Sequence, residues 1–98
     1  MTEEEIIKFF ADKSNNDEYI KFDKVDNKRN NRPDIHAFLL LDELVPGKFD
    51  IVSSAEHDQF WLDVDAEKLE GILTEEQAVE LIRCGIMCDD EGDFYMFA

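Results

Sequence analysis

The chain has 98 residues, and its 25 acidic against 10 basic side chains give a formal net charge of −15. This length predicts one domain, residues 1–98, and a content of 44% hydrophobic and 11% aromatic residues excludes a fully disordered chain. The charge excludes direct binding to nucleic acid, which needs a basic surface, and no apolar run approaches the ~20 residues of a membrane span.

A capped helix is predicted at the N-terminus, over residues 2–11. Thr2 is its expected N-cap and Glu5 completes a capping box, while apolar side chains recur at spacings of three and four. Turn-forming residues at Ser14–Asp17 end this helix. The residues that follow, Tyr19–Phe22, favour a short strand.

A polar segment comes next, at residues 23–34, and it contains the one basic cluster of the chain. We expect a mobile, solvated loop here, or a loop that pairs with the acidic half of the molecule. Asp34 is the expected N-cap of a second helix over 35–44, which Pro46 and Gly47 end. The basic residues of the loop are Lys24, Lys28, Arg29 and Arg32.

After Asp50 the hydrophobic period changes to two. This alternation predicts strands over 51–55 and 60–64, joined by a turn at 56–59. One face of the second strand belongs to the core, and Trp61 lies with Asp63 on the other face. The residues expected on the core face are Phe60, Leu62 and Val64.

Two further helices are expected before the C-terminus. Asp65 caps a short one over 66–70, and a capping box from Thr74 to Gln77 opens another over 75–84. Gly85 suits the left-handed backbone conformation that commonly follows a helix.

The last residues predict a second hairpin, with strands over 86–88 and 94–97 around an acidic turn at 89–93. The predicted fold class is therefore α+β: a small single domain with two N-terminal helices, followed by antiparallel hairpins with an intervening helix.

The sequence contains few metal-ligating residues in a recognisable spacing. Cys84 and Cys88 form a C-x3-C pair, but His36 and His57 lie in unrelated predicted elements. Zinc sites need four ligands, usually from tighter cysteine pairs, so we expect two reduced cysteines packed as small hydrophobic residues.

The pattern D-x-D-x-E of residues 63–67 resembles the start of a calcium-binding loop. An EF-hand loop that began there would need Gly and Glu at positions occupied by Lys68 and Thr74. The acidic turn at 89–93 is rich in oxygen ligands, but it is equally an ordinary hairpin turn. No metal ion and no other cofactor is therefore predicted.

Catalytic residue types are present without a catalytic arrangement. Ser53, Ser54, His57 and Asp58 lie within six residues of one another, whereas the members of a triad converge from different elements. A pair of Cys84 with His57 has no local sequence pattern to support it. No glycine-rich phosphate-binding or dinucleotide-binding motif occurs. We therefore expect that the protein is not an enzyme.

The negative charge is concentrated in the C-terminal half. Residues 1–49 carry eleven acidic and eight basic side chains, a net of −3, whereas residues 50–98 carry fourteen acidic and two basic, a net of −12. The only basic residues of this half are Lys68 and Arg83. The total charge exceeds the magnitude of about 2–8 that solubility asks of a small domain.

A rigid array of carboxylates can imitate the phosphates of a nucleic acid. We therefore predict a small acidic interaction protein that blocks a basic nucleic-acid-binding protein by mimicry. By analogy of size and charge, such inhibitors are typical of phages and mobile elements and act on host CRISPR or restriction complexes. Trp61 is either an anchor within the interface or packs against a helix. The predicted partner-binding residues are Asp58, Trp61, Asp63, Asp65, Glu67, Glu70, Glu75, Glu76, Glu80, Asp89, Asp90, Glu91 and Asp93, with Asp50 and Glu56 as further members of the array.

Two other functions fit the sequence. One is a non-enzymatic phage or bacterial adaptor whose contact with its partner is apolar, and the other is a small-ligand binder or enzyme with a deep polar pocket. The chain is expected as a monomer, or as a homodimer through an edge strand. Because Met1–Glu5 lack a basic secretory region, we expect it in the cytoplasm, that of the host if it is phage-encoded.

The charge predicts that salt stabilises the fold. Raising the NaCl concentration from about 0.05 M to about 0.5 M shortens the range of repulsion between carboxylates. The midpoint of thermal unfolding, followed by circular dichroism, should therefore rise. An unchanged or lower midpoint would show that self-repulsion is not a main destabilising force in this chain.

Overall fold

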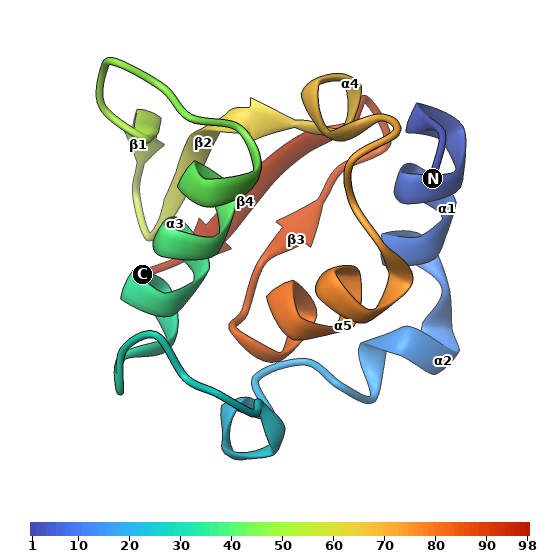
Figure 1. The fold of residues 1–98 in the computed structure, drawn as a ribbon. Coiled ribbons are helices and arrows are strands. Elements are labelled where there is room, and N and C mark those ends of the chain that lie inside the picture. Colours follow the sequence, from blue (N-terminus) through green and yellow to red (C-terminus); the bar gives the residue numbers. More distant parts are fainter.

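The computed structural model describes residues 1–98 and has an α+β architecture, as the sequence predicts. A single antiparallel sheet of four strands has the order β1-β2-β4-β3. The helices lie on one side of this sheet, and the other side is uncovered (Figure 1). None of the helices has the length and apolar character needed to cross a membrane.

The N-terminal helix is confirmed, with the predicted cap. Helix α1 spans Glu3–Ala11, and Thr2 and Glu5 form the capping box. The predicted turn after it contains one more helical turn, α2 at Lys13–Asn16, because Asp12 accepts a hydrogen bond from the Ser14 N–H and caps it.

The predicted strand at Tyr19–Phe22 is wrong. These residues form turns that lead into a 3-10 helix, η1, at Phe22–Lys24. Ile20 has a positive φ of 60°, and its N–H bonds to the carbonyl of Ile82 rather than to a strand. The segment lacks a neighbouring strand, so its apolar residues serve instead to hold the loop against the helices.

Helix α3 spans Pro33–Leu44 and begins two residues earlier than predicted. Asp34 is therefore not its N-cap but lies in its first turn. Pro33 explains the difference, because proline is preorganised for the first helical position and lacks the N–H that would be unsatisfied there. The preceding residue, Arg32, makes no side-chain capping bond.

Two hairpins supply the sheet. The first joins β1 (Val52–Glu56) to β2 (Gln59–Asp65) through a turn of two residues, shorter than predicted. The second joins β3 (Met87–Cys88) to β4 (Asp93–Phe97). Strands β2 and β4 pair antiparallel and so unite the hairpins into one sheet.

The two helices between the hairpins follow the prediction closely. Helix α4 spans Ala66–Leu69 and is capped by Asp65. Helix α5 spans Glu75–Arg83 and opens with the Thr74–Gln77 capping box. Both helices pack on the same side of the sheet as α1 and α3 (Figure 1).

The core lies between this helical layer and the inner face of the sheet. Ring contacts join the two layers: Phe10 of α1 lies 5.0 Å from Phe94 of β4, and Phe38 of α3 lies 6.2 Å from Phe60 of β2. The predicted inward face of β2 is confirmed, since Leu62 and Val64 are buried. Completely buried side chains include Ile6, Leu41, Leu69, Leu81 and Phe94.

Two phenylalanines of β4 should differ sharply in their contribution to stability. Phe94 is 0% exposed on the inner face, and Phe97 is 50% exposed on the outer face. Phe94→Ala should lower the free energy of unfolding by about 3–5 kcal/mol, because it leaves a cavity in the core. Phe97→Ala, the matched control, should lower it by about 1 kcal/mol or less. Urea unfolding measures both, and equal losses would contradict this placement of the two rings.

Candidate partner-binding surface

The uncovered face of the sheet carries a row of side chains that crosses all four strands. Ser54 of β1 is paired with Trp61 of β2, Trp61 with Tyr95 of β4, and Tyr95 with Met87 of β3. Residues opposite one another on neighbouring strands share a face, so this row lies on one surface. We call it the outer row.

Aromatic rings lie at the centre of this face. The rings of Trp61 and Tyr95 are 5.0 Å apart between centroids, and those of Tyr95 and Phe97 are 5.7 Å apart. None of the three belongs to the buried core cluster or to the partly buried residues packed against it. Trp61 therefore lies on the non-core face, as predicted, and it packs against a neighbouring aromatic residue rather than a helix.

A shallow hollow of about 360 Å³ lies on this face beside Trp61. Its rim carries three carboxylates from the second hairpin, those of Asp89, Glu91 and Asp93, together with Ser54 of the edge strand. Four of the residues named as candidates from the sequence thus come together at one place, although they lie in two separate hairpins.

Hydrogen bonds fix the carboxylate of Asp89 and the backbone of the acidic turn between β3 and β4. Asp89 Oδ1 accepts hydrogen bonds from the N–H groups of Glu91 and Asp93, at 3.0 and 2.9 Å. Partial burial raises the pKa of the Tyr95 phenol, and the negative charge of Asp89 raises it further. The carboxylate of Asp89 therefore lies close enough to the Tyr95 hydroxyl to disfavour its ionisation.

The acidic turn also packs against α4. The carbonyl of Gly92 accepts a hydrogen bond of 2.9 Å from the N–H of Ala66. Gly92 has a φ of +92°, and a Cβ on it would lie 3.3 Å from the Cβ of Ala66. A glycine is needed at this close approach. The contact brings the acidic turn next to the carboxylates of α4.

More acidic residues surround this end of the molecule. Glu67 and Glu70 lie in or just after α4, and Glu75 opens α5. The first turn of α1 was not predicted to belong to this region, but it joins the other acidic residues: Glu70 Oε2 accepts a hydrogen bond of 2.7 Å from the N–H of Glu3. We call this region the acidic end. Its members are Glu3, Glu4, Glu5, Asp63, Asp65, Glu67, Glu70, Glu75, Asp89, Asp90, Glu91 and Asp93.

The structure places several predicted residues elsewhere. Glu76 lines a hollow with Asp26 and Arg29 of the basic loop, and Glu56 is the last residue of β1, next to the β1–β2 turn. Asp58 lies in the two-residue turn between β1 and β2, at the far end of β2 from Asp65. Glu80 points into the molecule and bonds to the buried His36. Its side chain is committed to this internal contact and is not part of an open array.

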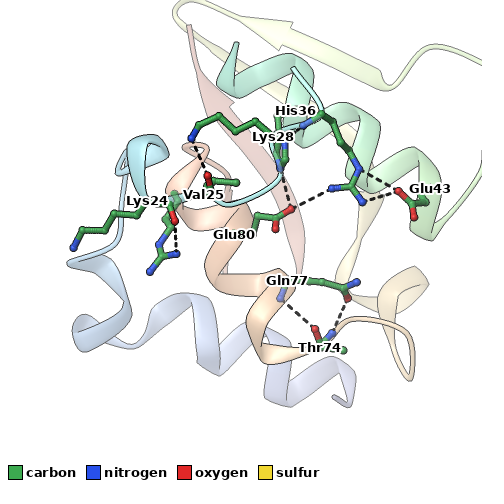
Figure 2. Close-up of polar contacts among 10 residues, drawn as sticks. Lys24, Val25, Lys28, His36, Glu43, Thr74, Gln77 and Glu80 are labelled. Carbon is green, nitrogen blue, oxygen red and sulfur yellow. Dashed lines mark hydrogen bonds and ion pairs between the residues drawn. The ribbon is translucent and has the colours of Figure 1, made fainter. Parts of the chain in front are cut away.

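The internal contact of Glu80 belongs to a network around His36, shown in Figure 2. His36 is completely buried, and its Nδ1 accepts a hydrogen bond from the Arg29 N–H at 3.0 Å. Its Nε2 therefore carries the proton that is donated to Glu80 Oε2 at 2.9 Å. The Arg29 guanidinium contacts Glu43 at 2.7 Å and Glu80 at 3.6 Å. These bonds fasten the basic loop to α3 and α5.

The basic loop and the acidic end occupy opposite ends of the molecule (Figure 1). The expectation that the loop pairs with the acidic half holds for Arg29, through Glu80. Lys28 instead donates to the carbonyl of Val25 and lies over the Phe22 ring, 5.2 Å from its centroid. The cations of the loop do not neutralise the acidic end.

The cysteines and histidines lie outside the hollow beside Trp61. Cys84 and Cys88 are free thiols, and burial, with nearby carboxylates, raises the pKa of each to about 12. A thiol with such a pKa is protonated at neutral pH and is a poor nucleophile. His57 is exposed in a turn, 3.9 Å from Glu56. No group of three or more His, Cys, Asp or Glu side chains is arranged to hold a metal ion.

Comparison with protein-family models, with curated proteins and with solved structures finds no match to this chain.

Replacing Glu80 or Glu76 tests the His36 network with two variants that change the net charge equally. The two glutamates lie one turn apart on α5, and each replacement by alanine removes one carboxylate. Glu80→Ala leaves the buried Nε2–H of His36 without an acceptor and should lower the free energy of unfolding by about 1–3 kcal/mol. Glu76→Ala should leave it within about 0.5 kcal/mol of the parent. Equal values from urea unfolding would show that the His36 network does not stabilise the fold.

Proposed function

We propose that this protein is a small acidic inhibitor that binds a basic partner and occupies its nucleic-acid-binding surface. The partner class is a protein that binds DNA or RNA, such as a host defence complex of the CRISPR or restriction type. The protein would act as a monomer in the cytoplasm of the cell that contains this partner. Inhibition would be competitive, without a catalytic step.

One observation carries this proposal: the carboxylates of the acidic end outnumber the cations near them, which are Lys68, Lys8 and the N-terminal ammonium group. In the C-terminal half, Lys68 contacts Asp63 at 3.7 Å, and Arg83 contacts Glu18 at 2.7 Å. Of the two, only Lys68 lies within the acidic end. A concentration of like charge opposes folding, so its persistence is better explained by a partner of opposite charge.

The acidic end rests on rigid elements. Its carboxylates belong to the hydrogen-bonded β3–β4 turn, to α4 and to the first turns of α1 and α5. Fixed carboxylates can meet a groove that binds phosphates without the loss of conformational entropy that a disordered acidic tail would suffer. Complementary charge would also speed the encounter of the two proteins.

The aromatic rings on the uncovered sheet face support a second function, that of an adaptor with an apolar contact. Trp61 and Tyr95 are partly exposed, and Phe97 is half exposed. Tryptophan and tyrosine are enriched among the residues that dominate binding energy. In this case the charge would be incidental, and binding would change little with salt.

A pull-down from bacterial lysate distinguishes the two functions. The tagged protein is incubated at low and moderate salt, with and without competing duplex DNA, and retained proteins are identified by mass spectrometry. Inhibition by mimicry predicts a nucleic-acid-binding protein that salt and DNA release. The adaptor predicts a partner indifferent to both.

Two triple variants serve as a matched pair. The test variant carries Glu67→Lys, Asp90→Lys and Glu91→Lys in the acidic end, at exposed positions whose carboxylates make no hydrogen bond. The control carries Asp17→Lys, Asp23→Lys and Asp26→Lys, with the same change in net charge, near the basic loop. The test variant should lose the partner and the control should retain it. Equal retention by both would contradict binding through the acidic end.

A further inference from the structure

We propose that the uncovered face of the sheet binds an arginine-bearing segment of the partner, with a guanidinium group against Trp61 and Tyr95. This inference rests on the proposed function, since it names the chemistry by which the basic partner would be recognised. It adds a site, because the acidic end by itself attracts any cation, whereas the outer row selects one kind of side chain.

The first support is the combination of the Trp61 ring, which adjoins Tyr95, with carboxylates around one hollow. Trp61 forms part of the hollow, and Asp89, Glu91 and Asp93 form its acidic rim. A guanidinium group stacks on an aromatic face and also donates several N–H bonds to carboxylates. Arginine therefore satisfies both features at once, which neither an apolar side chain nor an acidic one does.

The second support is that the chain provides no cation of its own at this place. None of the ion pairs in the structure involves Asp89, Glu91 or Asp93. Arg83, the basic residue nearest to them in the sequence, pairs with Glu18. Lys68, the basic residue nearest to Trp61 in the sequence, donates to the carbonyl of Asp63 at 2.8 Å and lies 3.7 Å from its carboxylate. The charges at the hollow are left for a partner.

Charge also decides between the occupants of this face. A second copy of the chain would place its own carboxylates opposite those of the first, and like charges in an interface are repulsive. An uncharged apolar segment would cover the rings and leave the neighbouring carboxylates desolvated and unpaired, which opposes binding. A segment with arginine covers the rings and pairs the carboxylates.

The single tryptophan of the chain permits a direct test with the unmodified protein. A short peptide of alternating arginine and glycine is titrated into the protein, and the emission of Trp61 is followed. A lysine–glycine peptide of equal length and charge is the matched control. Binding of each peptide is measured in parallel by isothermal titration calorimetry. The arginine peptide should change the Trp61 emission and bind about tenfold more tightly than the lysine peptide.

Three variants test the contribution of the aromatic rings to peptide binding. Trp61→Ala should reduce the affinity for the arginine peptide to that for the lysine peptide, whereas Trp61→Phe should keep part of the difference. Calorimetry on Tyr95→Phe, which retains the ring, should match the parent. If the Trp61→Ala protein does not fold, the comparison of the two peptides and the Trp61→Phe variant still test the arginine site.

The outcomes separate this inference from the proposed function. Equal affinity for both peptides, or binding that leaves the Trp61 emission unchanged, overturns the arginine site but keeps an acidic protein that binds basic partners. Binding of neither peptide at low salt overturns both. Emission that changes with protein concentration alone would assign the face to a second copy and overturn the inference.

Discussion

The pairing of β2 with β4 is the constraint on which the rest of the structure depends. It joins two hairpins that are separated in the sequence by α4 and α5, and it completes the sheet. Because successive residues of a strand point to opposite faces, the same pairing assigns Leu62, Val64 and Phe94 to the core and Trp61 with Tyr95 to the uncovered side. The helical layer is thereby anchored, and the aromatic face is formed at the same time.

The distribution of charge is a second property of this arrangement. The acidic turn at 89–93 lies beside the other carboxylates of the acidic end because Gly92 packs against α4. The first turn of α1 joins them because the Glu3 N–H bonds to Glu70. Carboxylates from four parts of the sequence therefore repel one another in the folded state. The fold tolerates this repulsion because its apolar core is continuous between the helices and the sheet.

The acidic end and the basic loop differ in how they are stabilised. Arg29 is held by Glu43 and Glu80, and the buried His36 links the loop to α3 and α5. These bonds satisfy polar groups inside the molecule, so they serve the fold. The carboxylates around Trp61 satisfy few such groups. This difference is the physical basis for assigning recognition to one end of the molecule and structural support to the other.

The sequence by itself determined the elements with strong local chemistry. The capping boxes at Thr2 and Thr74, the cap at Asp65 and the alternation of β2 all occur as predicted, because each depends on residues a few positions apart. The net charge and its concentration after Asp50 also needed no structure. The prediction from local sequence was wrong at Tyr19–Phe22, where the composition favours a strand but no neighbouring strand is available to pair with it. It failed again at Asp34, where the preceding proline sets the start of the helix.

Only the tertiary structure decided which side chains share a surface. It joined Trp61 to Tyr95, turned Glu80 inward toward His36, separated Asp58 from the acidic end and added the first turn of α1 to it. Contacts of this kind join residues far apart in the chain. They depend on strand order and register and on helix packing, which no local pattern in a single sequence specifies.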